Sequence, residues 1–193
     1  MCRGSSVVEQ RIENPRVGGS IPPRGTTSIL VDKSMQEILK QLQAWQIPFT
    51  LFEHEAFFTC EDGEWFKTEN PGAHVKNLFL RNKKKDKYFL VTVLQEKRMN
   101  MKELESKIGG KNVSFGSPED LMTFLGLTPG AVSPLGLIND TAHTIEFFLD
   151  SDVLKEEVVY VHPNVNTATV KLKVADLQRF LEKTGNTWSM LAI

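Results

Sequence analysis

Two apolar runs joined by a basic turn stand out in the sequence: Gly72-Ala73-His74-Val75-Lys76-Asn77-Leu78-Phe79-Leu80, then Asn82-Lys83-Lys84-Lys85-Asp86-Lys87, then Tyr88-Phe89-Leu90-Val91-Thr92-Val93-Leu94. Short runs of aromatic and β-branched residues bounded by polar turn residues are typical of β-strands. We therefore predict two strands connected by a hairpin turn. His74, Lys76 and Asn77 lie near the start of the first strand. A lysine just before an apolar run is a candidate for a charge placed at a specific site.

Composition sets broad limits on the class of protein. The chain has 193 residues, of which 40% are hydrophobic and 24% charged, so one globular domain is expected. A net charge of -1 argues against a protein that coats nucleic acid, although it permits a local basic patch. Two cysteines and four histidines without ligand spacing indicate neither a disulfide framework nor a metal site. With no membrane-length apolar run and no signal-peptide core, a cytoplasmic protein without a membrane partner is expected.

Residues 1–30 differ from the rest because they are rich in Gly, Pro, Arg and Ser and have no sustained apolar period. One interpretation is a disordered tail. The other is a non-native segment, since in a single frame it can be back-translated into the D-arm, anticodon arm and T-arm of a tRNA gene, at residues 4–10, 11–15 and 19–22. On this hypothesis the native chain starts at Val31 or Met35, and the functional domain is residues 31–193. The upstream nucleotide sequence tests it.

Periodicity and turn signals divide the remaining chain into alternating elements. Helices are predicted at 34–47, 59–66, 101–108, 118–126 and 175–183, and strands at 49–52, 78–80, 88–94, 113–115, 144–149, 158–161 and 167–174. The first helix has a capping-box start at Ser34, and a Thr59 or Asp62 cap is expected for the second. Mixed helices and strands with hairpin connections indicate an α+β fold with a mixed sheet and packed helices. A doubly wound domain is disfavoured because no Gly-rich phosphate loop follows the first strand.

Several polar candidates remain, each with a structural alternative. Lys76 is either a surface lysine or a point charge for a phosphate or ribose hydroxyl. The turn at Lys83-Lys84-Lys85 is either a solvated hairpin tip or a contact to a nucleic-acid backbone. The Gly130–Pro134 loop is either a rigid connector or a source of backbone N–H donors. His162 is either structural or functional, while Cys60 is interpreted as a small buried residue. Nothing polar is expected to converge on His54 or His143.

Taken in order, five motifs resemble one family: Gly72-x-His74-x-Lys76-Asn77-Leu78-Phe79-Leu80, Ser114-Phe115-Gly116-Ser117, Gly130-Ala131-Val132-Ser133-Pro134, Gly136-Leu137-Ile138-Asn139-Asp140 and His162-Pro163-x-x-Asn166-x-x-Thr169. This is the YbaK-like, prolyl-tRNA-synthetase-associated editing domain family, and within it the free-standing prolyl-tRNA editing proteins. The resemblance extends over residues 35–185. It implies a mixed, barrel-like β-sheet surrounded by helices, and hydrolysis of the ester that joins a mischarged amino acid to the tRNA 3′ end, without a cofactor or metal.

The resemblance also implies roles for individual residues. Lys76 would be the essential catalytic residue, holding the terminal adenosine and its phosphate, and Gly130 would act with it. Substrate binding would fall to His74, Asn77, Ala131, Val132, Ser133, Pro134 and His162, with His162 limiting the size of the amino acid. The expected substrate is Ala-tRNA(Pro), and the alternatives are Cys-tRNA(Pro) or a non-catalytic tRNA- or protein-binding module. Prolyl-tRNA synthetase or an elongation factor as a further partner is left open.

Overall fold

The computed structural model describes residues 7–8, 26–56 and 63–193, with side chains described from residue 33 onward outside the gap. The helices are α1 (Thr26–Ala44), α2 (Glu64–Glu69), α3 (Met101–Lys107), α4 (Pro118–Leu125) and α5 (Val174–Thr184), with 3₁₀ turns η1 (Pro134–Asn139) and η2 (Val153–Lys155). The strands are β1 (Val7–Val8), β2 (Thr50–Glu53), β3 (Ala73–Arg81), β4 (Tyr88–Leu94), β5 (Ser114–Phe115), β6 (Ile145–Asp150), β7 (Val158–Val161), β8 (Ala168–Lys173) and β9 (Trp188–Leu191).

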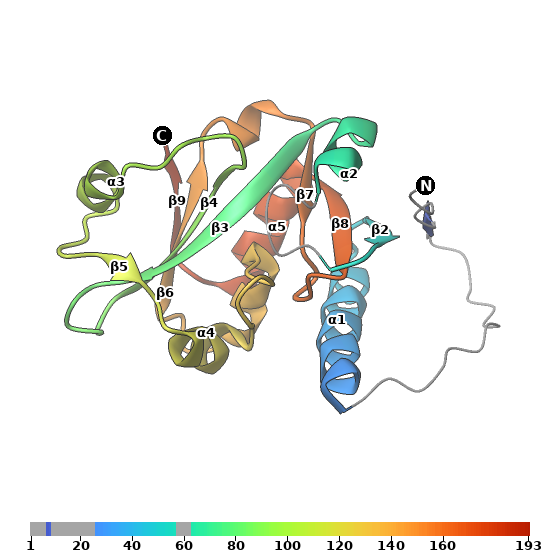
Figure 1. The fold of residues 1–193 in the computed structure, drawn as a ribbon, viewed down its shortest axis with the longest axis horizontal. Helices are drawn as coiled ribbons and strands as arrows, with labels where there is room; N and C mark the ends of the chain where they lie inside the picture. The colour runs from blue at the N-terminus through green and yellow to red at the C-terminus, as the bar shows by residue number, and fades with distance from the viewer. Residues whose placement is uncertain (1–6, 9–25, 57–62) are drawn as a thin grey trace.

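Within these described ranges the strands form one mixed sheet in the order β1-β2-β8-β7-β3-β4-β6-β9, with β5 added beside β3 (Figure 1). The β3–β4 pair is the predicted antiparallel hairpin, whereas β7–β3, β4–β6 and β6–β9 are parallel. The hydrogen-bonded order runs from β1 to β9 without returning to its start. The predicted class, α+β with a mixed sheet and helices packed around it, is confirmed.

Strand β3 joins the two halves of the sheet and determines where a cavity can form. Its first two residues pair with β7, in the register Ala73↔Val159 and His74↔Tyr160. From Val75 onward β3 pairs with β4, up to Arg81↔Tyr88. The parallel strands β3 and β7 therefore part after His74, and the side chains that follow on β3 lie at the opening between them.

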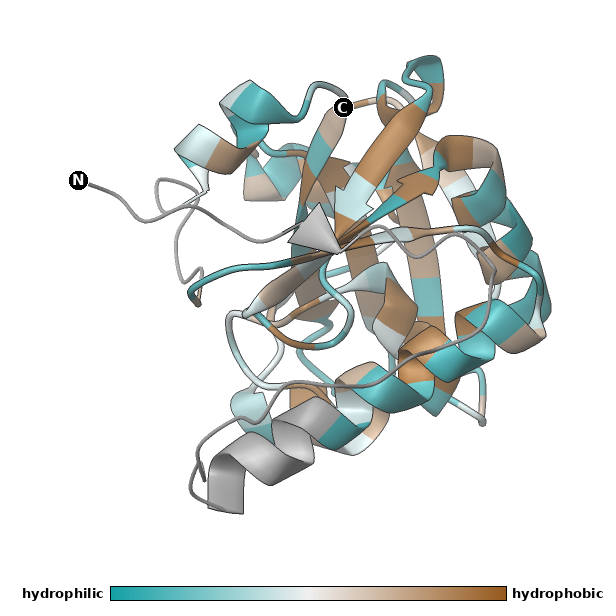
Figure 2. Cartoon of the chain, turned by 90° about the vertical axis from the view of Figure 1, so that its right-hand side faces the viewer, coloured by the Kyte–Doolittle hydropathy of each residue, from teal (hydrophilic) through white to brown (hydrophobic). Residues whose placement is uncertain are grey.

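Strand β4 is buried on both faces, which explains its nearly continuous apolar sequence. Tyr88 and Leu90 belong to a large core that also contains residues of α1, α4, η1 and α5. The alternate residues Phe89, Val91 and Val93 belong to a second core beneath α3. Figure 2 shows this arrangement, with mostly apolar strands at the centre and hydrophilic outer helix faces.

Local capping signals place the helix ends correctly at α4. The Ser117 side chain accepts from the Asp120 N–H in a capping box, and Gly126 ends the helix with φ 64°.

Helix α1, by contrast, begins at Thr26, so the predicted start at Ser34 is wrong and Ser34 lies inside the helix. The sequence reading also missed β9, an edge strand. Its middle residues are exposed, so it lacks an alternating apolar pattern.

Some sequence predictions are not tested by the structure. The Thr59 or Asp62 cap and both cysteines, Cys2 and Cys60, lie outside the described residues. Helix α2 begins at Glu64 after Gly63, which provides no side-chain cap. The non-native origin of residues 1–30, and with it a domain of residues 31–193, stays a prediction.

Candidate active site

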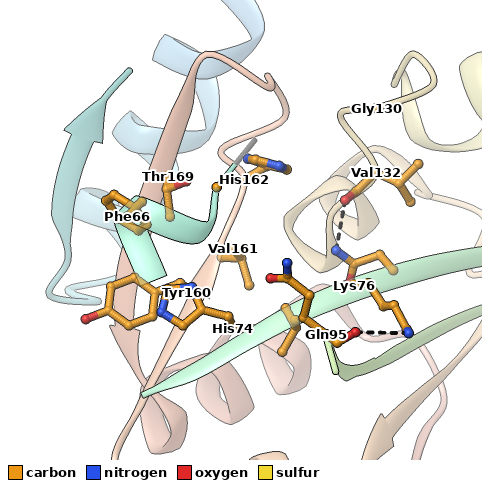
Figure 3. A pocket seen from close by; sticks show the side chains of 13 residues that line it. Phe66, His74, Lys76, Gln95, Gly130, Val132, Tyr160, Val161, His162 and Thr169 are labelled. Carbon is orange, nitrogen blue, oxygen red and sulfur yellow. Dashed lines mark hydrogen bonds between the residues drawn. The ribbon is translucent and has the colours of Figure 1, made fainter. Parts of the chain in front are cut away.

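A cavity of about 250 Å³ opens where β3 and β7 part (Figure 3). It is lined by residues of β3 and β7, the Gly130 loop and their neighbours: Gly63, Phe66, His74, Val75, Lys76, Asn77, Gln95, Gly130, Val132, Tyr160, Val161, His162 and Thr169. The structure therefore brings Lys76, the Gly130 loop and His162 to one cavity, although Lys76 and His162 are more than 80 positions apart in sequence. Such a small, mostly preformed hollow with a few polar groups is typical of a ligand site.

Two backbone carbonyls of the segment after β4 hold the Lys76 ammonium at the edge of this cavity. Lys76 Nζ donates to Gln95 O at 3.0 Å and also to Lys97 O. An ammonium has three N–H donors, so these two bonds orient the group and leave one donor for a ligand. Lys76 is only partly buried, so its charge can be offered to a substrate without a large desolvation cost.

The carbonyl of Lys97 is fixed in turn by the side chain of the same residue. Lys97 Nζ contacts the buried Asp150 at 2.8 Å and Asp152 at 2.6 Å, and it donates to Ile193 O at 2.9 Å. Burial lowers the pKa of Lys97, but the hydrogen bonds to both aspartates outweigh it and leave that pKa raised. Lys97 therefore stays charged and anchored, which steadies the acceptor for Lys76.

Asn77 links the Gly130 loop to the sheet. Its Nδ2 donates to Val132 O at 2.9 Å, and its Oδ1 accepts from Thr92 Oγ1 at 2.6 Å. Asn77 and Thr92 are directly opposite in the β3–β4 register, so the second bond follows from the strand pairing. The amide consequently positions the loop, and its predicted contact with substrate stays a prediction.

Within the Gly130–Pro134 loop, some groups line the cavity and others support the fold. Gly130 has φ 89°, a conformation that favours glycine, and it lines the cavity together with Val132. The Ala131 N–H donates to Thr128 O, and the buried Ser133 hydroxyl accepts from the Leu135 N–H. Within the described residues, the N–H groups of Gly130 and Val132 make no hydrogen bond, so they are the candidate donors. The predicted binding roles of Ala131, Ser133 and Pro134 stay predictions.

His162 is held in one orientation. Its Nδ1 lies 2.9 Å from Ala168 O, so Nδ1 carries the proton and donates. Burial lowers the pKa of His162, against the opposing effect of this hydrogen bond. A neutral ring with a protonated Nδ1 has an unprotonated Nε2, and His162 lines the cavity. The site therefore gains an uncharged hydrogen-bond acceptor opposite Lys76.

An aromatic group closes the far side of the cavity. The His74 ring stacks on Tyr160 with centroids 4.4 Å apart, and its Nε2 bonds to Asn70 O at 2.7 Å. Phe66 meets both rings edge-on. Burial lowers the pKa of His74, so its ring serves as a neutral, fixed wall. His74 does line the cavity, as its predicted binding role requires.

The sequence reading missed a polar pair behind His162. His54 Nε2 lies 2.9 Å from Thr169 Oγ1, and the His54 and His162 ring centroids are 6.5 Å apart. The expectation that nothing polar converges on His54 is therefore wrong. Thr169 was visible only as the last position of the His162 motif, and the cavity residue Gln95 carried no sequence signal.

Metal-ligand clusters and membrane-spanning helices were both sought in the described part of the chain. No three His, Cys, Asp or Glu side chains among the described residues converge as metal ligands. None of the helices in the described ranges is long and apolar enough to cross a membrane.

Comparison with known proteins assigns this arrangement to a class. The aminoacyl-tRNA editing domain family matches residues 54–180, which include Lys76, the Gly130 loop and His162. The chain belongs to this family. It is accordingly an aminoacyl-tRNA hydrolase, an enzyme that cleaves the ester between an amino acid and tRNA.

Individual relatives are similar to this chain over most of its length. The prolyl-tRNA editing protein ProX of Acetoanaerobium sticklandii is 37% identical over 158 residues, covering 82% of this chain and 96% of that protein. The prolyl-tRNA synthetase associated domain-containing protein 1 of Mus musculus is 36% identical, covering 78% and 90%. A crystal structure of a proposed trans-editing enzyme for prolyl tRNA synthetase shares the fold, with a TM-score of 0.62 over 83% of this chain and 97% of that one, at 19% identity.

Proposed function

We propose that this chain is a trans-editing deacylase that hydrolyses mischarged tRNA(Pro), with Ala-tRNA(Pro) as its main substrate. The similarity to ProX supports tRNA(Pro) as the carrier. The observation that carries the chemistry is a small cavity lined both by Lys76, whose ammonium is held by Gln95 O, and by the Gly130 loop. Those two groups suit the negative terminal nucleotide and the reacting carbonyl, respectively.

The reaction needs positioning more than a strong nucleophile, because an aminoacyl ester is already activated. A water oxygen attacks the ester carbonyl carbon, the bond from that carbon to the ribose oxygen breaks, and the ribose oxygen leaves with a proton. Lys76 fixes the terminal nucleotide through its remaining N–H donor. The unpaired N–H groups of Gly130 and Val132 stabilise the negative charge that develops on the carbonyl oxygen.

Size selection follows from the walls of the cavity. His162, Phe66 and the stacked His74–Tyr160 pair are held by hydrogen bonds or ring contacts, so the cavity cannot easily enlarge. A cavity volume of about 250 Å³ favours a small acyl group such as alanyl. A synthetase pocket separates side chains that differ by a methylene by only about 1–3 kcal/mol, so a second, size-limited site improves accuracy.

The test is a deacylation assay on tRNA(Pro) charged with alanine, cysteine or serine. Wild-type protein is expected to release alanine fastest. Lys76→Ala should lose most of the activity while its urea unfolding midpoint stays close to that of the wild type, since Lys76 is partly exposed. The exposed Lys102→Ala serves as the matched control and should keep wild-type rates. Unchanged rates in Lys76→Ala would remove this residue from the mechanism.

Two alternatives remain within the reach of the same assay. Faster release of cysteine than of alanine would assign Cys-tRNA(Pro) as the substrate. Binding of tRNA without release of any amino acid would assign a non-catalytic binding module. A prolyl-tRNA synthetase or elongation-factor partner stays a prediction.

A further inference from the structure

A second cavity, of about 200 Å³, adjoins the first along β3. It is lined by Asn77, Phe79, Phe115, Gly116, Ser117, Pro118, Leu121, Pro129, Gly130 and Val132. The two cavities share Asn77, Gly130 and Val132, so the Asn77-to-Val132 hydrogen bond contributes to the wall of both. Whatever occupies the second cavity is therefore adjacent to a ligand in the first.

Phe115 is an exposed aromatic residue on a fixed backbone. The residue is 60% exposed although it lines this cavity. The backbone on both sides is held by the β5–β3 pairs Leu80↔Phe115 and Arg81↔Ser114 and by the Gly116 N–H bonded to Phe79 O at 2.9 Å. A Cβ at Gly116 would lie 2.4 Å from the Phe79 ring, so this glycine lets the strand pack directly on the cavity floor. The ring is thus presented to solvent by a rigid support.

The floor of the cavity is also aromatic and rigid. Phe79 stacks on Tyr88 with an interplanar angle of 11°, and Tyr88 packs against Phe124 at a centroid distance of 4.2 Å. A cavity lined by both an exposed and a buried aromatic ring suits a planar, polar-edged ligand. Single-stranded nucleic acids present such groups, since every base has a face that stacks on aromatic side chains.

The charge at the far end of β3 matches the same ligand. Strand β5 pairs with the last residues of β3, immediately before the turn Asn82–Lys87 (Figure 1). That turn carries Lys83, Lys84, Lys85 and Lys87 against one aspartate, Asp86, and all five side chains are exposed. Opposing charges lie on α4, where Asp120 is paired with Arg81 at 3.3 Å and Glu119 faces Lys85. The turn retains an excess of positive charge, which attracts a phosphate backbone.

We propose that the cavity beside Phe115 is a nucleobase-binding subsite, in which a base of the single-stranded tRNA 3′ end stacks on the Phe115 ring. The single-stranded 3′ end of the tRNA would run from the lysine turn past Phe115 to the cavity that Lys76 lines. This inference rests on the proposed function, because it places the rest of the same ligand. It adds a binding residue, Phe115, and a direction of entry.

The experiment measures binding without hydrolysis, by isothermal titration calorimetry. The probes are 3′-alanylamino-3′-deoxyadenosine, whose amide is not an ester, and the same compound extended at its 5′ end by two cytidines. Phe115→Ala is expected to weaken binding about 10-fold, within the range for loss of one stacked base. Phe115→Trp should retain the affinity. Met122→Ala is the matched control, because Met122 is 49% exposed, lies on α4 and lines neither cavity.

The outcomes separate cleanly. Weakened binding of both probes assigns the subsite to the terminal adenine, and weakened binding of only the extended probe assigns it to a cytosine. Equal affinities of wild type and Phe115→Ala for both probes would overturn the inference. If Phe115→Ala then also changed the oligomeric mass measured by light scattering, Phe115 would be a contact between copies of the chain instead. A wild type that binds in a Phe115-dependent way but releases no alanine from Ala-tRNA(Pro) would refute the proposed function alone.

Discussion

Replacement of Asn77 by alanine should both destabilise the protein and slow deacylation, because this side chain is the link between the sheet and the Gly130 loop. The change removes the 2.9 Å bond to Val132 O and the 2.6 Å bond from Thr92. Each hydrogen bond contributes about 0.5–1.5 kcal/mol net, and a buried polar group left unpaired costs about 1–3 kcal/mol. The Thr92 side chain is fully buried, so the expected loss in free energy of unfolding is about 2–4 kcal/mol.

The expected effect on catalysis acts through the Gly130 loop, and two further variants separate it from the effect on stability. Thr92→Val removes the buried hydroxyl but leaves the Asn77 bond to Val132, so it should cost stability and have less effect on the rate. Asn77→Asp keeps an acceptor for Thr92 but replaces the donor to Val132 O with a carboxylate oxygen. It should lower the deacylation rate about 10-fold or more, in line with a misplaced group at an active site.

Urea unfolding and single-turnover deacylation of Ala-tRNA(Pro) measure these two quantities on the same samples. The reasoning requires Asn77→Asp to fall further in rate than Thr92→Val. If Thr92→Val were the slower enzyme, or if Asn77→Ala kept the wild-type rate, the loop would not depend on this amide and the argument would be refuted.

Three further changes test other parts of the structure. Gly72→Ala should lower the free energy of unfolding by about 1–3 kcal/mol in urea denaturation, because φ is 138° and a Cβ would lie 2.6 Å from a valine methyl of β7. Lys97→Met leaves the fully buried Asp150 without a counterion, so it should cost about 3–5 kcal/mol in the same assay, whereas the exposed Lys155→Met should cost little. Burial lowers the pKa of His162 in the folded state, so its contribution to stability is complete above an unfolded pKa of about 6.5 and falls as the pH drops toward the folded value. Melting temperatures at pH 7.5 and 5.5 should therefore differ less in His162→Gln than in the wild type, and an unchanged difference would contradict this.

Much of the fold was predictable because its signals are local. The hairpin of β3 and β4 follows from two apolar runs around a lysine turn, and α4 from a serine cap at one end and a glycine at the other. The start of α1 and strand β9 were not predicted. Strand β9 has exposed middle residues and no alternating pattern, and its parallel pairing with β6, between Phe147↔Trp188 and Asp150↔Leu191, defines it.

For the site, the sequence alone determined the identity of the candidate groups: a lysine beside a strand, a loop of glycine and proline, and a histidine before Pro163. Only the tertiary structure decided how they act. It parts β3 from β7 to open a cavity, selects which loop N–H groups stay unpaired, and joins Asn77 to Val132 across 55 positions of sequence. The physical reason is that a residue's type and its near neighbours set local conformation, whereas hydrogen bonds and cavities form between segments brought together by packing of the whole chain.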